Sequence, residues 1–290
     1  MLGALLIDKP KGITSHDVIR VLRKKFDTRR IGHSGTLDPL ATGLLVVMVG
    51  PATRLLQYLQ LEPKGYEYTV RFGQETDTQD SEGEVIQERP VPSDLGAAIE
   101  GAMPPFIGRI QQTPPMFSAV KKDGRPLYAY ARAGEVVDRP AREVVIHELD
   151  LTSVDAPHAT FRTVCEGGTY VRTLANDLGE AIGCGAHVTE LRRTRVGRFS
   201  AEDAVPLDDV TPNDLLPVED ALDPMEKIQV STDQESALRC GQSVPISDRP
   251  DGELVAMLDE SGNLICIARI RDNEAHPECV MPKENGDGDV

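Results

Sequence analysis

Strand-like and helix-like segments follow one another irregularly along the first 200 residues, and this order narrows the choice of fold more than any other feature. Residues 66–72 alternate aromatic or apolar with polar side chains, which is the period of a half-buried strand. Residues 18–26 carry apolar side chains at helical spacing after a threonine–serine pair that can cap a helix. Further strands are expected at 143–151 and 158–165, and a helix at about 170–182. Because strands and helices do not alternate strictly, we predict an α+β fold with a central mixed or antiparallel sheet flanked by helices.

Composition divides the chain into two parts. Residues 206–224 are acidic and proline-rich, which is typical of a linker. Residues 1–205 are numerous enough for one large domain, and residues 225–282 show short strand patterns between Gly and Asp turns, which indicate a small β-rich domain. The tail at 283–290 is expected to be disordered. Turn residues crowd the stretch from about 111 to 142, which we predict to be a surface insertion that carries binding.

The net charge of −16 is concentrated near the C-terminus. Residues 1–200 carry 25 basic and 25 acidic side chains, whereas residues 201–290 carry 6 basic and 22 acidic ones. Basic residues of the neutral part gather at 20–30, 121–125 and 192–198. One such cluster is usually a solvated face, but three on a neutral domain favour a surface that binds phosphate. We therefore expect any nucleic acid to bind almost wholly to residues 1–200.

The cysteine spacing and the short apolar runs argue against several classes of protein. The five cysteines are widely spread without a CxxC pair, so neither a disulfide framework nor a metal site is expected. No apolar run approaches the roughly 18 residues of a membrane span. The apolar run within residues 1–10 is too short for the core of a signal peptide. We expect a cytoplasmic protein that does not bind membranes.

Several short motifs could each be ordinary structure, but they occur together in a fixed order. Alone, Asp38 would be a turn aspartate, Tyr66 a packed strand residue, and residues 167–174 a strand-to-helix corner. Together they resemble the TruB family of tRNA pseudouridine synthases over about residues 3–200, whereas the C-terminal part resembles a PUA-like module more weakly. The motifs that carry the resemblance lie at 8–18, 32–43 (GHSGTLDPLATG), 64–66, 73–83, 114–119, 168–174 and 184–193.

The resemblance implies a pseudouridine synthase fold, a small PUA-like domain and a role for each matched position. Asp38 corresponds to the catalytic nucleophile. Tyr66 corresponds to the residue that stacks on the flipped uracil and is a candidate for proton transfer. Tyr170, Arg172 and Leu191 would line the pocket, with the arginine paired to the aspartate. The expected RNA contacts are His33 and the basic residues Lys9, Arg29, Arg30, Lys121, Lys122, Arg125, Arg192 and Arg193.

The chemistry suits these residue types. Conversion of uridine to pseudouridine breaks the C1′–N1 bond and forms a C1′–C5 bond without redox change, so no cofactor is expected. A carboxylate nucleophile divides one difficult step into two. An aspartate is ionised at neutral pH, and a neighbouring Arg172 would keep the carboxylate of Asp38 ionised despite burial. Removing the base from its stack costs a few kcal/mol, of which stacking on Tyr66 could return roughly 1–3 kcal/mol.

The resemblance implies that the substrate is the T-arm stem-loop of tRNA, in which the uridine at position 55 becomes pseudouridine. A monomer without an obligatory protein partner is expected. Two alternatives stay open: a guide-RNA-dependent enzyme that works with partner proteins, and a non-catalytic chaperone that helps tRNA to fold. A glycosidase would need a second acid, and no partner for Asp38 stands out. One departure is Phe117, where the family often has tyrosine.

Overall fold

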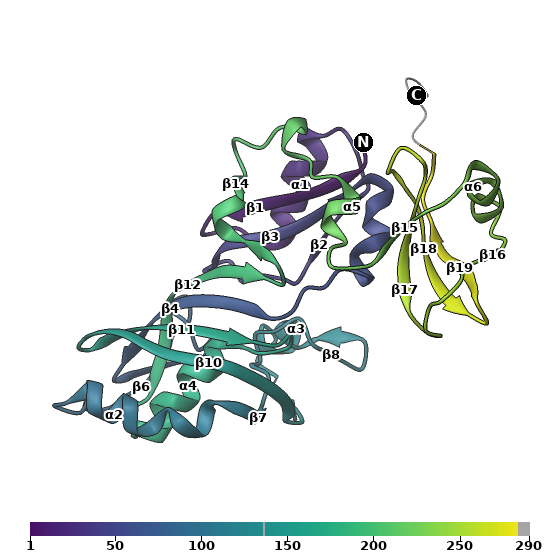
Figure 1. Ribbon diagram of the computed structural model, residues 1–290. Helices are drawn as coiled ribbons and strands as arrows, with labels where there is room; N and C mark the ends of the chain where they lie inside the picture. The colour runs from purple at the N-terminus through teal and green to yellow at the C-terminus, as the bar shows by residue number, and fades with distance from the viewer. Residues whose placement is uncertain (136, 284–290) are drawn as a thin grey trace.

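The largest element of the computed structural model, which describes residues 1–135 and 137–283, is a ten-stranded sheet (Figure 1). Neighbouring strands are antiparallel except for β1 with β14 and β3 with β12, which are parallel. The predicted α+β fold with a mixed sheet is therefore confirmed. The strand order is β14 (Val205–Pro206), β1 (Gly3–Lys9), β3 (Thr42–Val49), β12 (Ala186–Val196), β4 (Lys64–Phe72), β11 (His158–Cys165), β10 (Arg142–Asp155) and β7 (Gly108–Gln112), with β2 (Ile31–Ser34) beside β3 and β13 (Phe199–Ser200) beside β12.

Capping residues in the sequence mark where the helices that pack on the sheet begin and end. Helix α1 (Ser15–Lys25) begins at a capping box in which the side chains of Thr14 and Asp17 each accept a hydrogen bond from the other's backbone N–H. Helix α4 (Val171–Ile182) packs against β12 and ends at Gly183, whose φ of 89° suits glycine. The shorter elements are α2 (Leu95–Ala102), α3 (Leu127–Ala131), the 3₁₀ helices Gly50–Gln57, Pro104–Phe106, Ala201–Asp203 and Pro212–Asp214, and the two-stranded pairs β5 (Gln74–Thr76) with β6 (Val85–Glu88) and β8 (Lys121–Lys122) with β9 (Arg125–Pro126).

The two halves of the large sheet meet between β3 and β12. Two residue pairs form this parallel joint, Arg192 with Thr42 and Arg193 with Gly43. Gly43 has a φ of 95°, and a Cβ atom there would lie 2.3 Å from the carbonyl oxygen of Arg193, so a glycine is required for the strands to approach. The loop that follows β2 leads into β3 of one half, and its Leu37 and Leu40 pack in one apolar cluster with β4 and α4 of the other half. Segments from both halves consequently face each other across the joint.

A second, five-stranded sheet forms the C-terminal part. Its order is β15 (Lys227–Gln229), β17 (Leu254–Leu258), β18 (Leu264–Arg271), β19 (Glu274–Val280) and β16 (Val244–Pro245). Helix α6 (Thr232–Arg239) starts at a capping box made by Ser231 and Gln234. One apolar cluster extends from this sheet into the large domain, so Ile267 and Cys279 share a core with Leu44 and Leu55.

The stretch 206–224, which was predicted as a linker, packs along the large domain. The backbone groups of Leu216 and Ala4 exchange hydrogen bonds of 2.8 and 2.9 Å, and α5 (Val218–Ala221) enters the apolar core that the two parts share. The domain limits stay a prediction. Of the predicted disordered tail, residues 284–290 lie outside the described residues. Among the helices of the described residues, none has the length and apolar character to cross a membrane.

Candidate active site

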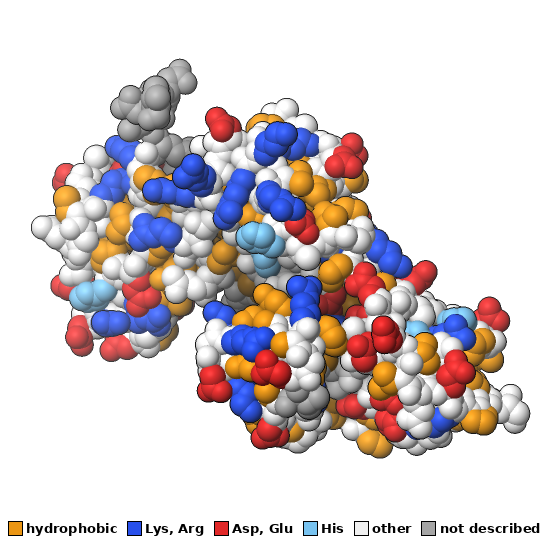
Figure 2. Space-filling model, turned by 180° about the vertical axis from the view of Figure 1, so that it is seen from behind, with side chains coloured by type: hydrophobic (Ala, Val, Ile, Leu, Met, Phe, Trp, Pro, Cys, Tyr) orange, Lys and Arg blue, Asp and Glu red, His pale blue; other side chains and the backbone are white. Residues whose placement is uncertain are grey.

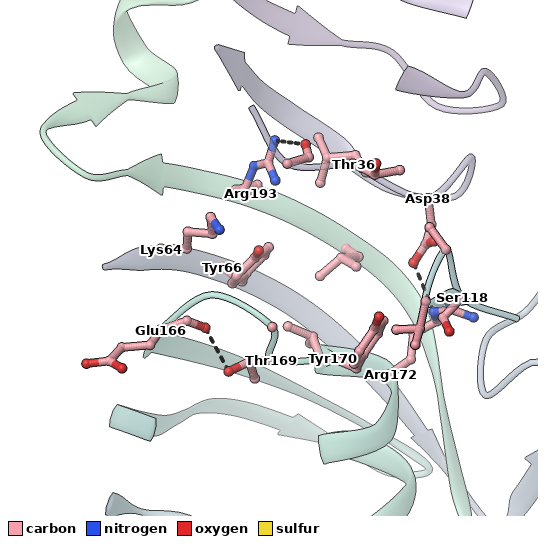
Figure 3. Close-up of a pocket in the computed structure, with 17 residues that line it drawn as sticks. Thr36, Asp38, Lys64, Tyr66, Ser118, Glu166, Thr169, Tyr170, Arg172 and Arg193 are labelled. Atoms are coloured by element: carbon pink, nitrogen blue, oxygen red, sulfur yellow. Dashed lines mark hydrogen bonds and ion pairs between the residues drawn. The ribbon is translucent and has the colours of Figure 1, made fainter. Parts of the chain in front are cut away.

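A pocket of about 370 Å³ lies where the two halves of the large sheet face each other (Figure 3). Asp38 comes from the loop between β2 and β3, and Tyr66 comes from β4. Tyr170 directly precedes α4, Arg172 is in its first turn, and Leu191 lies on β12. Five side chains that are far apart in the sequence, and for which a pocket role was predicted, therefore line one cavity.

The guanidinium of Arg172 contacts four acceptor groups at the wall of this pocket. Its Nε atom lies 2.9 Å from Oδ2 of Asp38, and its Nη1 atom lies 3.2 Å from Oδ2 of Asp80. Nη1 also donates to the carbonyl oxygen of Thr78, and Nη2 donates to that of Phe117, both at 2.8 Å. Only 4% of the arginine side chain is exposed. A planar guanidinium can serve these four acceptors at once, because its donors point in fixed and different directions.

Opposing effects act on the carboxyl group of Asp38. Burial raises its pKa above the ordinary value, the cation of Arg172 opposes that rise, and the like charge of Asp80 adds to it. The side chain keeps 36% exposure, so the carboxylate is held by the arginine and still faces the open pocket. Arg172 thus favours the ionised form that a nucleophile needs.

The hydroxyl of Tyr66 is strongly shielded. Burial raises the pKa of Tyr66 to about 12, and the guanidinium of Arg193 beside it opposes the rise. The phenol consequently stays protonated at neutral pH. In this state the hydroxyl can donate a proton or a hydrogen bond.

Asp80 is a site residue to which the sequence analysis assigned no role. Its Oδ1 atom accepts hydrogen bonds from Oγ1 of Thr78 at 2.6 Å and from the backbone N–H of Glu82 at 3.1 Å, which leaves Oδ2 for Arg172. The available signal was its place in the family motif at 73–83. Phe117 contributes through its carbonyl oxygen, so the exchange of tyrosine for phenylalanine does not alter that contact.

Two residues expected to contact RNA, Lys9 and Arg193, are buried in the structure, and their contacts with RNA stay predictions. Lys9 is fully buried, and its Nζ donates to the carbonyl oxygens of Pro10, Ile13 and Pro39 at 2.6–3.4 Å. Arg193 is 1% exposed and donates from Nε and Nη2 to two further carbonyl oxygens. The sequence shows the charge of these residues, but not the carbonyl groups that surround them. Both side chains hold segments around the pocket, and Arg193 also contributes to its lining.

The other expected RNA contacts lie at or near the surface. Arg29, Arg30 and Lys121 are exposed. The half-buried residues are Lys122, which donates to the carbonyl of Asp138, Arg125, which pairs with Glu135, and Arg192, which binds both carboxylate oxygens of Asp8. His33 is half-buried on β2, outside the pocket lining, and burial lowers its pKa. Their contacts with RNA stay predictions.

Two solved structures share this fold over nearly the whole chain. The chain superposes on a chain of "Structure of H/ACA RNP bound to a substrate RNA containing 2'-deoxyuridine" with a TM-score of 0.71 and 25% identity, covering 97% of this chain and 86% of that one. A chain of "Crystal Structure of a Cbf5-Nop10-Gar1 Complex" gives the same TM-score and coverage with 27% identity. These likenesses confirm the predicted fold class.

Sequence comparison gives the family. Residues 23–171 match the model "TruB family pseudouridylate synthase (N terminal domain)", and residues 172–228 match "tRNA pseudouridylate synthase B C-terminal domain". The relative named tRNA pseudouridine synthase B in Burkholderia lata is 46% identical over 96% of this chain and 90% of its own length. Its counterpart in Cupriavidus metallidurans is 43% identical over 96% and 94%. The chain belongs to the TruB family and is an enzyme of the isomerase class.

Proposed function

We propose that the protein converts the T-loop uridine of tRNA, at position 55, to pseudouridine, with Asp38 as the nucleophile that attacks the flipped nucleoside. The observation that carries this proposal is the 2.9 Å contact between Asp38 and Arg172 in a pocket lined by Tyr66. The names of the relatives support tRNA as the substrate. The same proposal includes a monomer that works in the cytoplasm without a cofactor or an obligatory protein partner.

The reaction needs a detached uracil that turns within the pocket. The bond between C1′ and N1 breaks, a bond between C1′ and C5 forms, N1 gains a proton and C5 loses one, so the product is an isomer of the substrate. The carboxylate of Asp38 attacks at the sugar or on the uracil ring and is released when the new bond has formed. The arginine contacts one carboxylate oxygen, Oδ2, while the Asp38 side chain stays 36% exposed toward the pocket.

The remaining lining residues suit a flipped pyrimidine. Tyr66 and Tyr170 offer aromatic surfaces, and Leu191 offers an aliphatic one. Flipping costs a few kcal/mol, and stacking on one aromatic ring returns about 1–3 kcal/mol. Exposed basic residues such as Arg29 and Lys121 would add contacts to the RNA backbone.

The test is incubation with an unmodified tRNA transcript, without cofactor, guide RNA or a second protein. Nucleoside analysis should show one pseudouridine in the T-loop, and the Asp38→Asn variant should make none. Asp150→Asn is a matched control because this exposed aspartate of β10 lies outside the pocket lining. Product from Asp38→Asn at the control's rate would remove Asp38 from its role. Product that requires an added guide RNA would favour the guide-dependent alternative, and improved tRNA folding without product would favour the chaperone.

A further inference from the structure

A buried amide side chain binds the backbone of one residue that lines the pocket. Gln112 is the last residue of β7, and only 2% of it is exposed. Its Oε1 atom accepts a hydrogen bond of 2.7 Å from the backbone N–H of Tyr170. Its Nε2 atom donates a hydrogen bond of 3.1 Å to the carbonyl oxygen of the same tyrosine. We call these two hydrogen bonds the amide clamp.

The partners of the amide clamp allow one orientation of the side chain. A backbone N–H can only donate and a carbonyl oxygen can only accept, so Oε1 must face the former and Nε2 the latter. The carbonyl oxygen of Tyr170 also accepts the backbone N–H of Leu174 at 3.0 Å. Both lone pairs of this oxygen are consequently in use. A side chain without both a donor and an acceptor cannot replace Gln112 here.

The amide clamp lies where α4 begins. Tyr170 precedes the first residue of this helix, and its own side chain makes no capping hydrogen bond. Because the N–H groups at the start of a helix have no partner within the helix, they need acceptors from elsewhere. Gln112 supplies such an acceptor for Tyr170. The position of the first turn, which contains Arg172, therefore depends on a residue from the edge of the sheet.

A second contact joins the same two stretches of chain. The carbonyl oxygen of Phe117 accepts a hydrogen bond of 2.8 Å from Nη2 of Arg172. Residues 112–117 are thus held at both ends against residues 170–172. Tyr170 and Arg172 line the pocket, and Arg172 contacts Asp38 (Figure 3). A shift at either end of this double contact would move the tyrosine ring or the arginine relative to the nucleophile.

Strand β7 gives the amide clamp a rigid base. Gln112 pairs with Arg142 of β10. Ile110, two residues earlier and therefore on the same face of the strand, packs against the apolar cluster that includes Leu174. Because pairing and packing fix the strand, the amide is in place before a substrate arrives. Groups that are oriented in advance save the entropy of ordering during the reaction.

We propose that Gln112 is a positioning residue for pseudouridine formation, because its amide sets the backbone of Tyr170 and with it the first turn of α4. This inference rests on the proposed function, since it takes the reaction to be the same one. Gln112 does not line the pocket, so it acts through Tyr170 and Arg172. Its loss should consequently lower the rate of the chemical step more than the affinity for tRNA.

Two variants of the full chain test the proposal, Gln112→Met and Gln112→Glu. Methionine keeps the length of the side chain and removes both hydrogen bonds. Glutamate keeps the acceptor, and its protonated form also has a donor for the carbonyl oxygen. The matched controls are Gln111→Met and Gln111→Glu, because Gln111 is the exposed neighbour on β7 and lies outside the pocket lining.

The glutamate control is needed because a new negative charge can weaken RNA binding by itself. Figure 2 shows Lys and Arg side chains gathered on one face of the molecule. An added carboxylate reduces the attraction of such a face for phosphate. Gln111→Glu adds the same charge one residue away, so the comparison of the two glutamate variants removes this effect.

The first measurement is single-turnover formation of pseudouridine at saturating tRNA. A buried polar group left without its partner accounts for about 10- to 100-fold in rate, and we expect this loss for Gln112→Met, with tRNA affinity changed by less than about twofold. Both Gln111 variants should match the wild type. The rate of Gln112→Glu relative to Gln112→Met should rise as the pH falls, because protonation of the new carboxyl group restores the donor.

The second measurement is hydrogen exchange at the backbone amide of Tyr170. Exchange should be about 10-fold faster in Gln112→Met than in Gln111→Met, because the amide has lost its acceptor. This measurement needs no turnover. If Gln112→Met does not fold, Gln112→Glu takes its place in both measurements, with Gln111→Glu as its control.

Four outcomes would count against one proposal or the other. The positioning role is wrong if Gln112→Met forms product as fast as Gln111→Met, even if it is less stable. It is also wrong if Tyr170 exchanges equally fast in both variants. A rate ratio of Gln112→Glu to Gln112→Met that does not change with pH would overturn the role of the donor. A wild type that binds tRNA without forming pseudouridine would overturn the proposed function instead, and amide exchange would still test the clamp.

Discussion

Replacing Arg172 by lysine tests whether the shape of the guanidinium, and not charge alone, assembles the site. The side chain contacts two carboxylates, of Asp38 and Asp80, and two carbonyls, of Thr78 and Phe117, at 2.8–3.2 Å. An ammonium group cannot serve all four in these directions. A hydrogen bond to a charged group is worth about 1.5–3 kcal/mol, and a loss of that size in the transition state lowers the rate about 10- to 100-fold. Because lysine keeps the charge but not all the contacts, we expect a loss within this range.

The assay is single-turnover formation of pseudouridine at saturating tRNA over a range of pH. A weaker contact between residue 172 and Asp38 lets burial raise the pKa of Asp38 further, so a smaller fraction is ionised at neutral pH. The deficit of the variant should therefore shrink as pH rises. Arg162→Lys is the control, because that arginine pairs with Glu67 on the exposed side of the sheet. A rate within about threefold of the wild type would refute the role of the planar guanidinium geometry. A deficit that grows with pH would refute the direction of the shift in the pKa of Asp38.

Three further predictions concern single residues. Tyr66→Phe should keep most of the RNA affinity, whereas Tyr66→Ala should lose about 1–3 kcal/mol of stacking, measured by equilibrium binding. Burial lowers the pKa of Lys9 from 10.5 to about 8, so its buried charge costs stability below pH 8, and the free energy of unfolding should rise between pH 8 and 10.5. Denaturant titrations should show a smaller rise for Lys9→Met. Gly43→Ala should lose at least about 1–3 kcal/mol of stability, because its φ is 95° and the new Cβ would meet Arg193. Gly101→Ala, inside α2 with open space around it, should instead gain up to about 1 kcal/mol.

Local sequence patterns located the elements whose two faces differ in polarity. The predicted strand 158–165 coincides with β11, and the predicted strand 143–151 lies within β10. Strand β2 was not among the predicted strands. This short strand pairs with β3, on which its formation depends, and it has no alternating pattern of its own. Tertiary pairing of this kind leaves little trace in a short stretch of sequence.

The family motifs predicted the residues that line the pocket better than they predicted the residues around it. Asp38, Tyr66 and Arg172 were expected together because each lies in a motif with an implied role, and the structure places them in one cavity. The role of Asp80 depends on where its loop lies relative to Arg172, which no local pattern reveals. The burial of Lys9 likewise depends on carbonyl groups from another segment, including that of Pro39.

The apolar layer beneath α4 couples core packing to the distance between the nucleophile and the residues that bind the base. Leu37, Val171 and Leu191 belong to this layer and also line the pocket, and Tyr66 packs against it. Asp38 directly follows Leu37, so a change of side-chain volume in the layer is transmitted to the carboxylate. Mutations that slow turnover while leaving both folding and RNA affinity intact are therefore expected to map to this buried layer.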